Sequence, residues 1–113
     1  MIFKGLGFPV VLLNVPRKKI RGEEIVDINY KVLSDNVFKA LIEKPARLSG
    51  AEIKFIRHHM KKNQEEFAEL IHVERSTISV WEKKDLNVTG MDAHVEAFIR
   101  LKMAAHTISR PRS

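Results

Sequence analysis

Residues 64–82 place the tightest limit on the fold, because apolar residues recur there at helical spacing on both sides of a short break. The apolar positions on the two sides of the break are Phe67, Leu70 and Ile71, then Ile78 and Trp81. Residues 72–74 interrupt the pattern. The spacing predicts two short amphipathic helices joined by a three-residue turn, which is the sequence form of a helix-turn-helix.

Several positions in this segment have a clear physical role. Ala68 must be small because the two helices cross closely there, while Val73 and Ile78 fill the wedge between them. Helical spacing leaves one set of residues pointing outward: Arg75, Ser76, Thr77, Ser79, Val80 and Lys83. A long cation and short hydroxyls suit a face placed in a DNA major groove, where they meet base edges and phosphates.

The same segment closely resembles the XRE/Cro family of DNA-binding regulators, which commonly reads Q-x-x-x-A-x-x-x-G-V-S-x-x-T-I-S-x-W-E. The chain keeps Gln64, Ala68, Val73, Thr77, Ile78, Ser79, Trp81 and Glu82. The resemblance implies that Gln64 contacts a phosphate through its backbone and side chain. It further implies that the base readers are Arg75, Ser76 and Val80, and that the DNA backbone is contacted by Thr77 and Lys83.

Three residues depart from the family pattern. His72 stands where glycine is usual, so a left-handed turn residue there would be strained. Glu74 replaces the usual Ser, Thr or Asp cap, and its carboxylate faces the phosphate side, which weakens DNA binding. Val80 occupies a position where many relatives have Arg, Gln or Asn. A valine there either contacts a thymine methyl or leaves that base unread.

Further helices are predicted on both sides of the segment. One covers residues 34–43, capped by Ser34 or Asp35 and stopped by Pro45. Capping boxes at residues 49–52 and 63–66 open the next two. A final helix begins near residues 89–92, and its predicted inner face is Met91, Val95, Phe98 and Leu101. Residues 107–113 are expected to form a disordered tail.

The first thirty residues have β-like composition. Residues 8–13 and 25–28 are short runs rich in aliphatic and β-branched side chains, and residues 14–22 between them contain Pro and Gly. This pattern predicts a hairpin or small meander. Because so few strands bury too little surface to be stable alone, the element must pack on another part of the chain.

Residues 5–12, 22–28 and 48–57 resemble the MqsA/YgiT-type antitoxins, in which a zinc-binding, β-rich N-terminal domain precedes an XRE domain. The zinc form has Cys-x-x-Cys-Gly-Glu where this chain has Lys18 to Glu23. The resemblance therefore implies a retained scaffold and a lost metal. It also implies a toxin held by the N-terminal domain, and a homodimer formed through residues 91–103 that binds a palindromic operator.

The net charge of +6 suggests a polyanionic partner such as nucleic acid, but the charge is unevenly placed. Residues 1–48 contain nine Lys and Arg against five acids, residues 49–85 contain seven of each, and residues 86–113 contain four against two. The predicted DNA-binding segment is therefore neutral. The basic run Arg17–Arg21 has two interpretations: a solvated hairpin tip, which we favour, or a contact with DNA or an acidic protein.

Other function classes find no support in the sequence. The absence of cysteine removes disulfides, thiolate catalysis and the usual structural zinc sites. The five histidines lack metal-ligand spacing, and no nucleophile–base pair or glycine-rich phosphate loop is evident. His94 and His106 are expected on helix surfaces. No signal peptide or membrane span is evident, so we expect a cytoplasmic protein without cofactors or enzymatic activity.

The predicted fold is mainly α, with a small β-rich N-terminal element and a lambda-repressor-like helix-turn-helix bundle. Residues 1–47 would form an interaction region of hairpin and helix that binds the toxin, and residues 48–106 the DNA-binding domain. The predicted function is a transcriptional repressor that binds a double-stranded DNA operator and acts as an antitoxin. Two alternatives stay open: a stand-alone XRE-type regulator without a toxin, and a protein-interaction module that has lost DNA binding.

Overall fold

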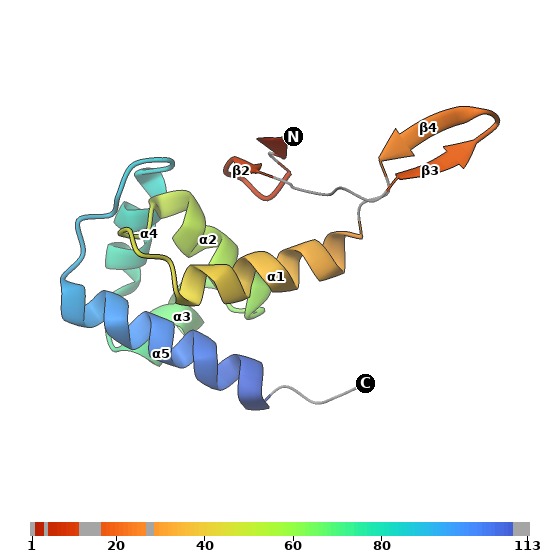
Figure 1. The fold of residues 1–113 in the computed structure, drawn as a ribbon. Coiled ribbons are helices and arrows are strands. Elements are labelled where there is room, and N and C mark those ends of the chain that lie inside the picture. Colours follow the sequence, from red (N-terminus) through yellow and green to blue (C-terminus); the bar gives the residue numbers. More distant parts are fainter. Residues whose placement is uncertain (1, 4, 12–16, 27–28, 110–113) are drawn as a thin grey trace.

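The computed structural model describes residues 2–3, 5–11, 17–26 and 29–109, and it is mainly helical, as predicted (Figure 1). The helices are α1 (Tyr30–Ile42), α2 (Gly50–His59), α3 (Gln64–Ile71), α4 (Arg75–Lys83) and α5 (Ala93–Ser109). The strands are short: β1 (Ile2–Phe3), β2 (Val10–Val11), β3 (Arg17–Ile20) and β4 (Glu23–Val26). Within these described residues, no helix combines the length and the apolar character that crossing a membrane requires.

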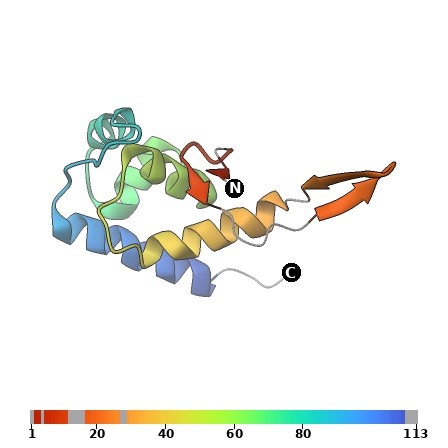
Figure 2. The same cartoon turned by 45° about the horizontal axis from the view of Figure 1, so that its top comes forward.

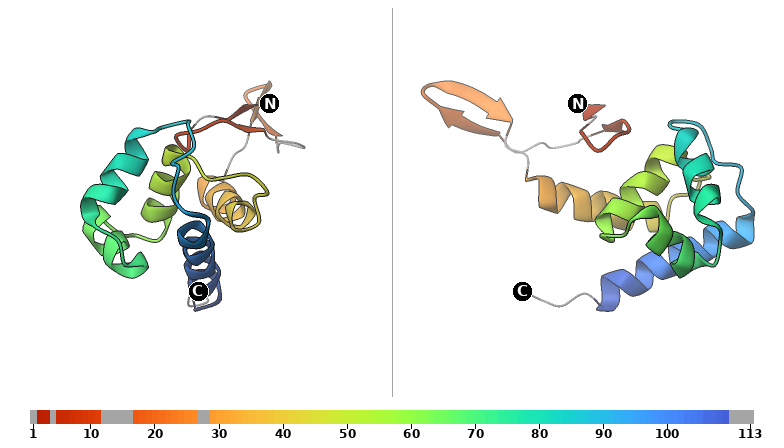
Figure 3. Two further views of the ribbon diagram at one scale, coloured as in Figure 1. Left: turned by 90° about the vertical axis from the view of Figure 1, so that its left-hand side faces the viewer. Right: turned by 180° about the vertical axis from the view of Figure 1, so that it is seen from behind.

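The helices pack around one apolar core. Helices α1 and α5 lie side by side and run in opposite directions, and α2 packs against both α1 and α4 (Figures 1 and 3). Helix α3 contacts α4 and α5. The side chains that are almost fully buried come from every helix and from the segment before α2: Phe38, Leu48, Ile53, Ile56, Phe67, Ile78, Ile99 and Met103. Ile53, Ile56 and Met60 are buried and form the inner face of α2 and its C-terminal end.

Both predicted capping boxes are present. The Ser49 hydroxyl accepts from the backbone N–H of Glu52, and Asn63 makes the equivalent bond with Glu66, while each glutamate side chain accepts from the N–H of its cap residue. The helix predicted at residues 34–43 is present as α1, but its predicted start and cap were wrong. Its cap is Asn29, whose side chain accepts from two backbone N–H groups in the first turn, so the helix begins four residues earlier than predicted.

The predicted inner face of residues 91–101 is confirmed in part: Met91 is buried, and Val95 and Phe98 are partly buried against the core, but the prediction for Leu101 of α5 was wrong. Leu101 is 65% exposed, and the fully buried positions are Glu96, Ile99 and Met103, which recur at helical spacing on the opposite side. The helix also continues to Ser109, so the sequence placed its end too early. Residues 104–108 include three alanines or isoleucines that sustain a helix, and the Thr107 hydroxyl donates to the Met103 carbonyl at 3.1 Å. Residues 110–113 lie outside the described residues.

Histidines link α1, α2 and α5. The His59 ring stacks on Phe38 with ring centroids 4.2 Å apart, and its Nε2 lies 2.9 Å from the Asp35 carboxylate. His106 packs edge-on against Phe38, with centroids 5.9 Å apart, so it is partly buried rather than fully exposed on the helix surface. His94 is exposed, as predicted. Among the described residues, no group of three or more His, Cys, Asp or Glu side chains is arranged to hold a metal ion.

A cluster of charges joins α5 to the end of α1. The Arg100 guanidinium donates to the carbonyls of Leu41, Ile42, Lys44 and Ala46. The same group donates to Glu96, 2.7 Å away, which also accepts from Arg47 at 2.5 Å. The last carbonyls of a helix have no hydrogen-bond partner within that helix, and Arg100 supplies donors to those at the end of α1.

The ionisation of Glu96 should make stability depend on pH. Burial alone would raise the pKa of Glu96, but hydrogen bonds and charge from Arg100 and Arg47 outweigh it, so the pKa lies below its usual value. The ionised form therefore stabilises the fold. We expect this stabilisation to be complete above the pKa of an unfolded glutamate and to be lost as the pH falls through the lower folded value. Urea unfolding across the acid range should show this loss, and Glu96→Gln should flatten the profile.

The strands form two antiparallel pairs, β1 with β2 and β3 with β4. The pairing differs from the predicted one: Arg17–Ile20 is strand β3 itself, and the tip of its hairpin is Arg21–Gly22. Both tip residues have positive φ angles, of 53° and 83°, as a type I′ hairpin turn requires. Figure 2 shows the β3–β4 hairpin projecting beyond the start of α1. Phe8 anchors the first loop, because its ring meets the Phe55 ring edge-on at 5.5 Å.

Candidate nucleic-acid interface

The two helices of the predicted motif, α3 and α4, are joined by a tight turn. His72 caps α3 in the left-handed conformation, with φ 59° and ψ 46°, as predicted from its place in the sequence. The N–H of Val73 donates to the Ala68 carbonyl at 2.9 Å, which closes the end of α3. The His72 ring stacks on Phe98 of α5, with centroids 6.0 Å apart. This contact offsets part of the backbone strain that a side chain incurs in this conformation.

The far end of α4 is fixed by α2. A Cβ atom on Gly50 would lie 2.2 Å from the Trp81 carbonyl oxygen, so only glycine permits the observed approach of the two helices. The loop after α4 then turns back over the start of α2. The N–H groups of Gly50 and Ala51 donate to the carbonyls of Asn87 and Asp85, at 3.1 and 2.7 Å. These two N–H groups at the start of α2 have no partner within their own helix, and their bonds to the loop hold the end of α4 in place.

A buried ionic network joins α2, α3 and α4. The Arg57 guanidinium makes two bonds to the Glu82 carboxylate, at 2.7 and 3.0 Å, and a third to the Lys62 carbonyl. The amide nitrogen of Gln64 also donates to Glu82, at 3.2 Å. The side chains of Arg57 and Glu82 are only 11% and 7% exposed. The phosphate contact that the resemblance implies for Gln64 therefore has to come from its remaining amide N–H or from the backbone at the start of α3.

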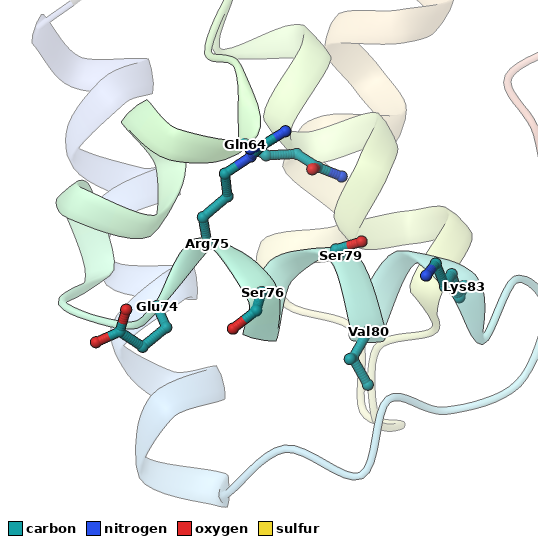
Figure 4. Close-up of a pocket in the computed structure, with 7 residues that line it drawn as sticks. All are labelled: Gln64, Glu74, Arg75, Ser76, Ser79, Val80 and Lys83. Atoms are coloured by element: carbon teal, nitrogen blue, oxygen red, sulfur yellow. The ribbon is translucent and has the colours of Figure 1, made fainter.

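The outer face of α4 and the start of α3 form an open concavity of about 580 Å³ (Figure 4). It is lined by Gln64, Glu74, Arg75, Ser76, Ser79, Val80 and Lys83. Six of the seven predicted interface residues are thus brought together. Thr77 is not among the lining residues and is partly buried. Figure 4 shows Arg75 reaching toward Gln64, while Ser76 and Val80 project from the side of α4 that faces away from Gln64.

The charge of this face differs from that of the neutral segment in which it lies. Glu82 is turned inward onto Arg57, and Glu52 is paired with Lys44 at 2.7 Å, so neither carboxylate lines the concavity. The charged residues that do line it are Arg75, Lys83 and Glu74. The segment is neutral in the sequence, but its outer face carries two cations against one anion.

Glu74 is the one acidic residue that lines the concavity, and it caps α4 without a side-chain hydrogen bond. We expect Glu74→Ser to stabilise the protein by about 1 kcal/mol, because a serine cap accepts from an orphan N–H. The same change should tighten DNA binding by removing a carboxylate from the face. Glu74→Gln is the matched control, because it removes the charge without supplying a cap. Thermal unfolding and DNA titration of both variants separate the effects, and equal unfolding midpoints would contradict the capping prediction.

The sequence did not reveal the residues that position this face. Arg57 could have been noticed as a cation next to the apolar residues Phe55 and Ile56, and Glu82 as the last residue of the motif. Gly50 could have been noticed because it directly follows the serine cap inside a capping box. Comparisons with family models, with curated proteins and with solved structures returned no match.

Proposed function

We propose that the protein is a sequence-specific DNA-binding transcriptional repressor that places α4 in the major groove. The supporting observation is the concavity that gathers Gln64, Arg75, Ser76, Ser79, Val80 and Lys83 on one open face. Its hydroxyls and cations match the donors and acceptors of base edges and phosphates. In this proposal α2–α5 form a lambda-repressor-like bundle, with the short strands as its β-rich N-terminal element.

We further propose that the repressor is a homodimer, because one short helix reads few bases and a second copy doubles the contacts across a palindrome. The outward row of α5 supports this. Ala97, Leu101, Ala105 and Ile108 recur at helical spacing, and all four are exposed, Ile108 at 85%. An uncharged row with small alanines lets the same helix of a second copy approach closely. The row extends the surface predicted at residues 91–103.

The proposed biological role is that of an antitoxin acting in the cytoplasm, with a cognate toxin bound by the N-terminal region. The β3–β4 hairpin supports this role, because two strands alone are marginally stable and leave unpaired edges that a partner strand can cover. A stand-alone regulator without a toxin is the second candidate. The interaction-module alternative would be favoured if a protein, and never DNA, protected α4 from hydrogen exchange.

Replacing Arg75 tests the proposal directly. If this side chain reads a guanine, Arg75→Ala should weaken binding to the operator by about 1–3 kcal/mol while leaving the fold intact. Lys39→Ala is the matched control, because Lys39 is an exposed cation on α1 and does not line the concavity. Fluorescence anisotropy with a labelled promoter duplex measures both. Equal losses in the two variants would contradict a specific role for α4.

A further inference from the structure

Val80 is the one apolar side chain among the residues that line the concavity. It is 53% exposed and shares that surface with hydroxyl, amide and charged side chains. We propose that Val80 recognises the C5-methyl group of a pyrimidine in the major groove. Each operator half-site then carries a methylated pyrimidine, thymine or 5-methylcytosine, at the base that Val80 faces. This inference rests on the proposed DNA-binding function.

The placement of Val80 along α4 carries the inference. Ser76, Val80 and Lys83 follow one another at i, i+4 and i+7, so they form one outward row. At the rise of an α-helix this row spans about 10 Å, which matches roughly three base-pair steps. Val80 lies between a hydroxyl and an ammonium group, and its own side chain can neither donate nor accept a hydrogen bond. In the major groove the C5-methyl group is the apolar feature of a base edge.

The surroundings of Val80 favour a base over a protein as its partner. A protein-docking surface has an apolar centre, whereas the other lining residues here are polar or charged: Gln64, Glu74, Arg75, Ser76, Ser79 and Lys83. The apolar side chains exposed just after α4, Leu86 and Val88, do not line the concavity. A single methyl group is a partner of the right size for one isolated valine.

The test replaces single methyl groups on the DNA. The full-length protein first selects its preferred duplex from a random pool, and each thymine of the selected half-site is then replaced by deoxyuridine, which lacks only the methyl group. We expect one position per half-site at which this replacement weakens binding about fourfold, the effect of one buried methyl-sized group. In Val80→Ala the sensitivity at that position should disappear. Replacing that base by cytosine and then by 5-methylcytosine distinguishes the two sources of the methyl group.

Val32→Ala is the matched control, because Val32 is 54% exposed on α1 and does not line the concavity. This variant should keep the full deoxyuridine sensitivity. If the wild-type protein binds its selected duplex but no deoxyuridine position matters, or if Val80→Ala keeps the sensitivity, the inference is wrong while the proposed function stands. If no duplex is selected, both are wrong. A Val80→Ala defect in binding a protein, with DNA binding unchanged, would instead assign this face to protein docking.

Discussion

Replacing Arg57 with methionine is expected to lower the free energy of unfolding by about 3–5 kcal/mol. Arg57 neutralises the buried Glu82 carboxylate through two hydrogen bonds and also donates to the Lys62 carbonyl. Methionine keeps most of the packing of the arginine stem but leaves Glu82 charged in a site with little access to water. Urea unfolding followed by circular dichroism measures the loss.

Two further variants identify the cause of this loss. Lys54→Met removes a cation from the exposed side of the same helix and should change stability little. The double variant Arg57→Met/Glu82→Met removes both charges, so it should be more stable than Arg57→Met alone. A double variant less stable than Arg57→Met would contradict this account.

Gly50→Ala is the second large expected effect, with a loss of about 2–3 kcal/mol in the free energy of unfolding. Alanine is the better helix former by about 1 kcal/mol, so helix propensity alone predicts stabilisation. The added Cβ, however, would lie 2.2 Å from the Trp81 carbonyl and 2.8 Å from the Asp85 backbone nitrogen. Backbone atoms cannot move aside as a flexible side chain does, so α2 and α4 must separate. Thermal unfolding measures the effect.

Gly90→Ala provides the contrast. Gly90 has a φ of 77° and open space where its Cβ would lie, so alanine there meets backbone strain of about 1 kcal/mol without a clash. We expect Gly50→Ala to be the more destabilising of the two, although backbone conformation alone predicts the reverse order. Separating α2 from α4 displaces the residues of α4 that line the concavity. Gly50→Ala should therefore also weaken DNA binding, and Gly90→Ala should not. The reverse order of stabilities would show that the helices tolerate the extra atom.

The motif helices could be predicted from the sequence because their signals are local. The capping residues Ser49 and Asn63 each act on a residue three positions away, and the apolar spacing of α3 and α4 repeats within a few turns. The left-handed turn at His72 was expected from the resemblance, because the family pattern has glycine at this position. Such predictions hold in the folded protein because the residues involved are already close together in the chain.

The positioning contacts could not be predicted because they join distant residues. Arg57 and Glu82 are 25 residues apart, and Arg100 reaches carbonyls more than 50 residues earlier. Nothing in the local pattern of α5 distinguished Leu101 from Ile99 as the buried residue, since packing against α1 decides the phase of that helix. The pairing of the N-terminal strands was mispredicted for a related reason: short apolar runs do not specify which runs pair.

Equilibrium binding of the protein to its own promoter duplex across a salt series is the direct test of whether α4 reads DNA. We expect saturable binding of two chains per duplex. Affinity should fall steeply with added salt, by a logarithmic slope of about 0.9 for each phosphate neutralised. Arg75→Ala should lose affinity at every salt concentration. A protein that is folded and yet fails to bind promoter DNA at low salt, or binds it no better than an unrelated duplex, would contradict the account.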